Sequence, residues 1–230
     1  MEVKERPIIF CGDMVCAILD GKKSATRRVI KPQPSSTCTG AIYNPSAFDP
    51  DRGWYFEGGG KLKCPYGRPG DLLWVRETWA KIWECEPPDT EDLKESPESF
   101  PWHIEYKANS DEKYPGDWPE DEGDNPDCAK WQSSRFMFKK YARLWLRITN
   151  VRVERVQEIR LPIAEGIEYR YDSVLEKPEY KVYGKLEKFD QWTKDPRWSF
   201  ETLWNSLNAK RGYSWESNPY IWVVEFERVK

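Results

Sequence analysis

The sequence predicts an α+β fold, a small mixed β-barrel with two or three helices and long loop insertions. Short segments of alternating apolar and polar residues, bounded by Gly, Pro, Asn or Asp, recur along the chain and are typical of short strands. Only two segments, one near each end, carry apolar residues at helical spacing. Strands that do not alternate with helices argue against a βαβ sheet and favour a barrel.

The composition fits one polar domain of 230 residues, with 39% apolar, 33% charged and 15% aromatic residues. Its 13 Trp supply large flat side chains for the core and for stacking on ligands. No segment approaches the ~18 apolar residues of a membrane-spanning helix. The first six residues are charged and lack the apolar region of a secretory signal. We therefore expect a cytoplasmic protein that does not contact a membrane.

The cysteines and the single histidine give little support for a metal site. The six Cys form no C-x-x-C pair, so a zinc ribbon is not indicated, and reduced thiols are expected in a cytosolic protein. A scattered site built from Cys38, Cys64, Cys85 and Cys128 is the alternative. His103 lies in an acidic, proline-rich stretch, so we expect an exposed loop residue and no histidine-based catalysis. We expect no metal and no cofactor.

The net charge of −3 hides an asymmetry along the chain. Residues 84–127 contain 16 Asp and Glu but only 3 Lys, a local charge of −13, and the remainder therefore carries +10. A basic body with an acidic insertion is typical of a polyanion-binding domain whose acidic loop shields or gates the basic surface. An acidic loop that only adds solubility is the alternative.

The basic run starts where the first helix ends. Residues 6–10 are expected to form a strand, and a helix follows at about 13–20, capped by Asp13 and ended by Gly21 in the left-handed conformation. The run then supplies four cations and two hydroxyls: Lys22, Lys23, Ser24, Thr26, Arg27 and Arg28. Arg offers a planar fork, Lys a point charge or a base, and Thr a hydroxyl, so this pattern predicts an anion or nucleobase site.

The middle of the chain predicts short strands between loops. We expect a second strand at 29–31, a hairpin that pairs 54–56 with 61–63, and a strand at 72–76 after a turn at 69–71. Arg76 and Glu77 end that strand, either as an ordinary surface pair or at the mouth of the barrel. Residues 84–130 hold 7 of the 18 Pro and read as an irregular insertion, with one strand expected at 103–108.

The last third carries the strongest patterns. Alternation over 143–156 predicts a hairpin, with Asn150 between its two halves. Residues 168–195 are expected to form an extended excursion. Apolar residues at positions 200, 203, 204 and 207 predict a core-facing helix with Ser199 as its N-cap. Lys210 and Arg211 suit the C-terminal dipole of that helix and are expected to contact nucleic acid. The chain ends in a strand at 221–226.

The basic run also carries a family resemblance. Gly21-Lys22-Lys23-Ser24-Ala25-Thr26-Arg27-Arg28 looks like the G-x-K-x-x-T-x-R signature of ASCH domains, small β-barrels related to the PUA RNA-binding fold. The chain resembles a prophage-type branch of that superfamily over nearly its whole length, through the following segments in the expected order: Arg6–Phe10, Cys64–Gly67, Pro69–Asp71, Trp74–Trp79, Val151–Val156, Ala164–Ile167 and Asn218–Phe226.

The resemblance implies a fold and a site. It implies one PUA-like domain over 1–230, with insertions at about 84–130 and 168–195, in which the basic signature and the Ala164-Glu165-Gly166 segment face one cleft. It also implies that the segment 131–137 approaches this cleft, here with Arg135 and Phe136 at variable positions of the family pattern.

Three functions follow as hypotheses. The first is binding of RNA or a modified nucleoside or nucleotide in a basic cleft, through Lys22, Arg27, Arg28, Arg76, Lys210 and Arg211. The second, implied by the resemblance, is an amidohydrolase that converts N4-acetylcytidine to cytidine. The third is a non-catalytic accessory protein of phage origin that acts on a host partner through its acidic insertion.

The hydrolase hypothesis assigns a role to each of three residues. Thr26 is the nucleophile or orients a water, and Lys23 is the base, with its pKa lowered by Arg28 and partial burial. Glu165 relays the proton, and backbone N–H groups hold the oxyanion.

Overall fold

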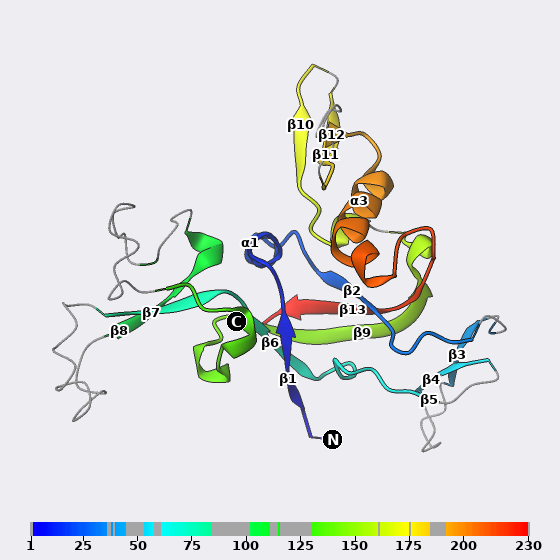
Figure 1. The fold of residues 1–230 in the computed structure, drawn as a ribbon, viewed down its shortest axis with the longest axis horizontal. Coiled ribbons are helices and arrows are strands. Elements are labelled where there is room, and N and C mark those ends of the chain that lie inside the picture. Colours follow the sequence, from blue (N-terminus) through cyan, green and yellow to red (C-terminus); the bar gives the residue numbers. More distant parts are fainter. Residues whose placement is uncertain are drawn as a thin grey trace. The chain divides into compact units, whose positions relative to one another are not determined.

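The computed structural model (Figure 1) shows a mixed α+β chain made mostly of strands. It describes residues 2–35, 38, 40–44, 53–57, 61–83, 102–110, 115, 130–160, 162–174, 176–184 and 192–229. The described α-helices are α1 (Gly12–Leu19) and α3 (Pro196–Asn208). The strands are β1 (Glu5–Ile9), β2 (Ala25–Val29), β3 (Ala41–Asn44), β4 (Gly53–Phe56), β5 (Lys61–Leu62), β6 (Leu72–Arg76), β7 (Trp79–Trp83), β8 (Trp102–Tyr106), β9 (Trp145–Arg155), β10 (Tyr169–Asp172), β11 (Lys177–Lys181), β12 (Trp192–Thr193) and β13 (Tyr220–Arg228).

Short 3-10 helices connect several of these elements. They are η1 (Lys107–Asn109), η3 (Ser134–Phe136), η4 (Lys139–Tyr141), η5 (Val156–Glu158), η6 (Pro162–Ala164) and η7 (Ala209–Arg211). The described helices are all too short or too polar to cross a membrane.

The chain divides into two compact units. The first consists of Met1–Arg6, Ala17–Leu73 and Leu146–Val229, and the second of Pro7–Cys16, Trp74–Trp145 and Lys230. The largest sheet has the hydrogen-bonded order β1-β6-β9-β13-β2, and most of β9 and all of β13 and β2 belong to the first unit. Among the described residues the strands form this open sheet and no closed barrel, so the expected barrel is not seen.

In the first unit, β13 lies between β9 and β2 in an antiparallel ladder (Figure 1). Val223 of β13 is opposite Arg152 on β9 and Arg27 on β2. The second strand was expected at 29–31, but β2 covers 25–29. The basic run is therefore itself a strand, because pairing with the apolar strand β13 outweighs the weak local strand preference of its Lys and Arg residues.

The strand signal at 143–156 is confirmed by β9, which runs from Trp145 to Arg155, but the hairpin expected there is wrong because β9 has no turn. The register shifts beside β13: Glu225 pairs with Asn150 and Phe226 with Ile148, which leaves Thr149 as an extra residue. Because of this β-bulge, the buried apolar side chains occupy even-numbered positions up to Ile148 and odd-numbered positions after it, as at Val153. The sequence pattern that suggested two strands is the pattern of one bulged strand.

Helix α3 covers one face of the first unit's sheet. Phe200 and Trp204 are buried in one core with Ile221 and Val223 of β13, and Leu203 packs against it, as predicted. Leu207, the last residue of the predicted stripe, is 44% exposed, so the stripe ends one turn earlier than expected. The N-cap is not Ser199. Asp195 accepts from the Arg197 N–H, Pro196 is the first helical residue, and Ser199 is buried.

Two smaller sheets complete the described part of the first unit. β4 pairs with β5, with Trp54 opposite Leu62, which confirms the hairpin predicted at 54–56 and 61–63. β3 pairs with the other edge of β4. The excursion at 168–195 forms a three-stranded sheet of order β10-β11-β12.

The second unit has its own core and the hairpin of β7 and β8. Trp79 is opposite Tyr106 in this hairpin, and the strand expected at 103–108 is confirmed at 102–106. Its buried core contains Trp74, Trp79, Met137 and Ala142. Most of the acidic insertion, with Cys85 and Cys128, lies outside the described residues.

Candidate functional site

The signature strand and the Ala-Glu-Gly segment meet in the first unit. Lys23 precedes β2 and Glu165 follows η6, and the two residues form an isolated antiparallel bridge. The Ser24 N–H donates to the Ala164 carbonyl at 3.0 Å. Two segments that are 142 positions apart in the chain are thus joined by their backbones.

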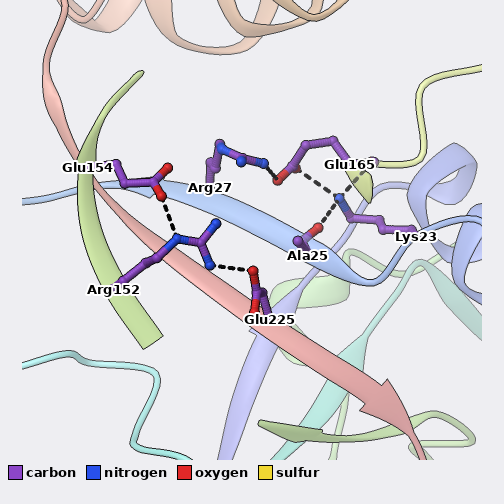
Figure 2. Close-up of polar contacts among 7 residues, drawn as sticks. All are labelled: Lys23, Ala25, Arg27, Arg152, Glu154, Glu165 and Glu225. Carbon is purple, nitrogen blue, oxygen red and sulfur yellow. Dashed lines mark hydrogen bonds and ion pairs between the residues drawn. The ribbon is translucent and has the colours of Figure 1, made fainter. Parts of the chain in front are cut away.

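The Lys23 ammonium group sits at the centre of this contact (Figure 2). Its Nζ donates to the Ala25 carbonyl at 2.7 Å, to the Glu165 carbonyl at 2.8 Å and to Glu165 Oε2 at 3.1 Å. Three acceptors match the three N–H donors of an ammonium group. Lys23 therefore ties the start of β2 to the turn after η6 as a buried cation.

Glu165 holds a second cation through its other oxygen. Arg27 Nη1 donates to Glu165 Oε1 at 2.7 Å, and the side chains of Arg27 and Glu165 are only 3% and 5% exposed. Arg27 also lies over the Phe200 ring, with Cζ 5.8 Å from its centre. The two buried cations, Lys23 and Arg27, thus share one carboxylate. Removing any one of the three charged groups is costly, because it leaves a buried charge without its partner.

Burial lowers the pKa of Lys23 below its ordinary value of 10.5, and the charges of Arg28 and Arg27 act in the same direction. The Glu165 carboxylate opposes this shift. The direction of the shift agrees with the prediction, which took Lys23 to be partly buried, whereas its side chain is fully buried.

Gly166 is required directly after Glu165. Its φ is +74°, and a Cβ there would lie 2.8 Å from Ala17 Cβ and 2.9 Å from Lys23 Cβ. A left-handed backbone and close packing both demand glycine. The sequence Glu-Gly is therefore what lets the carboxylate approach Lys23.

Thr26 and Arg28 lie on the other side of β2. Side chains alternate along a strand, so Thr26 and Arg28 project opposite to Arg27 and the Glu165 contact. Thr26 is buried and Arg28 half-buried. Burial raises the pKa of Tyr66, and the positive charge of Arg28 partly offsets this rise.

The other predicted nucleic-acid-binding residues are spread over both units. Lys22 is exposed and pairs with Asp20 at 2.9 Å, a contact that raises the pKa of Lys22. Lys210 and Arg211 are exposed in η7, which ends at Gly212. Arg76 belongs to the second unit, where its Cζ is 4.7 Å from the Trp74 ring centre.

Two charged clusters were not predicted from the sequence. Arg152 of β9 donates to Glu154 and to Glu225 of β13 (Figure 2). In this first cluster, Arg152, Glu154 and Glu225 lie on the same face of the sheet as Arg27, and only the strand register reveals this. The second cluster is that of Glu77.

The expected Arg76 and Glu77 pair is wrong in both of its forms. Glu77 is only 1% exposed, and Arg143 clamps it with two hydrogen bonds of 2.9 and 2.7 Å. The Glu77 carboxylate is therefore a buried support of the second unit. No spacing rule connects positions 77 and 143.

The described thiols give no metal site. Cys11, Cys16, Cys38 and Cys64 form no disulfide. Within the described ranges no three His, Cys, Asp or Glu side chains gather as metal ligands. The alternative site from Cys38, Cys64, Cys85 and Cys128 includes two residues outside those ranges.

Comparisons with known proteins do not assign a family. No family model and no solved structure matches the chain. The chain is similar to human geminin coiled-coil domain-containing protein 1, with 25% identity over 178 residues, 70% of this chain and 49% of that protein. The chain thus spans about half the length of that curated relative. The longest described helix, α3, has 13 residues, too few for the three or four heptads of a coiled coil.

Replacing Gly166 with Ala is expected to destabilise the first unit more than the same change at Gly212. Both glycines have positive φ, which costs an L-residue roughly 1–2 kcal/mol, but a Cβ at Gly212 meets nothing within 4 Å. The overlap at Gly166 adds roughly 1–3 kcal/mol. Urea unfolding of both variants measures the difference, and equal losses would contradict the close packing against Lys23.

Proposed function

We propose that the first unit is an ASCH-like module that binds RNA or a modified nucleotide on the Thr26 and Arg28 side of β2. The proposal assigns the β9-β13-β2 sheet to one wall of a PUA-like fold. The observation that carries it is the buried contact between Lys23 and Glu165, at 3.1 Å. It joins two of the segments on which the family resemblance rests, the basic signature and Ala164-Glu165-Gly166.

The chemistry of the Arg28 side of the strand favours a nucleotide. The Arg28 guanidinium is a planar donor suited to a phosphate or to the edge of a base. The hydroxyl of Thr26, a buried residue, is a donor and acceptor on the same side of the strand. Lys22 is exposed three residues before this strand, where Asp20 partly offsets its positive charge.

Replacing Arg28 with Ala is expected to weaken binding of a labelled single-stranded RNA. A bidentate Arg contact contributes about 1–3 kcal/mol, which corresponds to a 5- to 150-fold rise in Kd. Fluorescence anisotropy at several salt concentrations measures Kd. Arg170→Ala is the matched control, because Arg170 pairs with Glu179 in the β10-β11-β12 sheet. An unchanged Kd in Arg28→Ala, with a folded variant, contradicts the proposed site.

A second function, hydrolysis of N4-acetylcytidine, is favoured by the lowered pKa of Lys23 beside Glu165. In this mechanism the Thr26 hydroxyl attacks the acetyl carbonyl while the neutral Lys23 amine accepts the hydroxyl proton. The C–N bond then breaks, and the cytidine amine leaves with that proton. Water hydrolyses the acetyl ester on Thr26 to acetate. Because Thr26 projects to the opposite side of β2 from the Glu165 contact, this mechanism requires the Lys23 amine to leave Glu165 and reach the other side of the strand.

If this function holds, cytidine accumulates when the protein is incubated with N4-acetylcytidine, and Thr26→Ala abolishes the turnover. Thr26→Ser, which keeps the hydroxyl, retains measurable activity. Because the base must be neutral, kcat/KM rises with pH through an apparent pKa below 10.5. Chromatography follows the product. Turnover that persists in Thr26→Ala rules out this residue as the nucleophile.

A further inference from the structure

The second unit exposes two large aromatic side chains next to each other. Phe136 is 70% and Phe138 61% exposed, far more than a ring that contributes to a core. Arg135, Lys139 and Lys140 flank them and are also exposed. We refer to Arg135, Phe136, Phe138, Lys139 and Lys140 as the Phe136–Lys140 surface.

A rigid support presents these rings. Met137, between the two Phe residues, is only 1% exposed and belongs to the core of the second unit. The Glu77 N–H donates to Met137 Sδ at 3.3 Å, and Arg143 holds the Glu77 side chain. The 3-10 helices η3 and η4 lie on either side of Met137 and Phe138. The two rings are therefore fixed outward by a buried anchor between them.

Further rings and cations continue from the Phe136–Lys140 surface. Phe138 contacts Tyr141 edge to face, with ring centres 5.9 Å apart, and Tyr141 contacts Trp102 in the same way. Lys140 Nζ lies 5.0 Å from the Tyr141 ring centre and Lys139 Nζ 5.5 Å from that of Trp145. Ammonium groups and aromatic rings thus alternate over this part of the unit.

By sequence the second unit is acidic, because the insertion at 84–127 belongs to it. The charges next to the two Phe residues in the chain are positive, and they come from the exposed side chains of Arg135, Lys139 and Lys140. Glu77 is buried and held by Arg143, so it does not offset the exposed cations. An anionic ligand with flat apolar groups complements such a surface.

We propose that the Phe136–Lys140 surface binds single-stranded nucleic acid. Unpaired bases stack on Phe136 and Phe138, and phosphates contact Arg135, Lys139 and Lys140. A duplex keeps its bases stacked on each other and offers this surface only phosphates. The residues of this surface belong to the second unit and Arg28 to the first, and the proposal does not depend on the function proposed for Arg28.

The test is anisotropy of the full chain with a labelled single-stranded 12-mer and with the same 12-mer as a duplex. Phe136→Ser with Phe138→Ser is expected to raise Kd for the single strand at least about tenfold, since each stacked base contributes substantially. Lys139→Gln with Lys140→Gln is expected to reduce the slope of log Kd against log salt by about 1.4, from roughly 0.7 per phosphate contact. The Phe double variant is expected to leave the weaker duplex binding nearly unchanged. The Lys double variant is expected to weaken duplex binding, because it removes two positive charges.

Matched controls remove similar side chains elsewhere. Tyr171→Ser removes an aromatic residue that is 66% exposed, and Lys177→Gln with Lys194→Gln removes two exposed cations. These controls are expected to leave the Kd for the single strand within about twofold. Circular dichroism verifies that each variant is folded.

The outcomes are separable from those at Arg28. Loss of binding in the Phe double variant, with Arg28→Ala unchanged, supports this surface and rejects the proposed function of the first unit. An unchanged Kd in the folded Phe variant overturns the surface. Equal affinity for single strand and duplex, no nucleic-acid binding at all, or binding only to an acidic protein also overturns it.

Discussion

One buried carboxylate between two cations holds the first unit's site together. Glu165 faces Lys23 with one oxygen and Arg27 with the other, at 3.1 and 2.7 Å. In a protein interior an ion of one sign is too costly unless partners compensate it. The start of β2 and the turn after η6 are therefore interdependent, because neither can bury its charge without the other.

This constraint gives the two sides of β2 different tasks. Arg27 points toward Glu165 and the core under α3, where it contributes to the structure. Thr26 and Arg28 point to the other side of the strand, so their polar groups do not take part in the contact of Lys23 and Arg27 with Glu165. Binding sites supported on a rigid strand hold their geometry better than sites on loops. The five-residue strand β2 thus supplies both a structural residue, Arg27, and the proposed ligand contacts, Thr26 and Arg28.

Local chemistry predicted much of the fold. Gly21 has the expected left-handed conformation, and the strands at β1, β6, β8 and β13 lie close to their predicted positions. The errors arose where tertiary structure decides. A bulge at Thr149 made one strand resemble two, and Asp195 instead of Ser199 caps α3. A phase change in alternation without a turn residue such as Gly or Pro is better interpreted as a bulge.

The site was predictable only through its motif. Position 23 could be linked to position 165 through a family resemblance, whereas the Glu77 and Arg143 contact has no sequence signal because nothing local relates two such distant positions. The burial of Arg27 was likewise missed, since a basic run on its own suggests exposed cations. Register across β13 determines which cations turn inward, and register depends on the whole sheet.

The most direct test of the account is a double-mutant cycle on the buried pair, with Lys23→Met, Glu165→Gln and the double variant measured by urea unfolding. A close buried charge pair is expected to show a coupling free energy of at least about 1.5 kcal/mol. The exposed pair of Lys181 and Glu168, at 2.6 Å, serves as the reference and is expected to show roughly 0–1 kcal/mol. If the two single losses at Lys23 and Glu165 add to the double loss within about 0.5 kcal/mol, the carboxylate does not hold the strand and the turn together, and the account is contradicted.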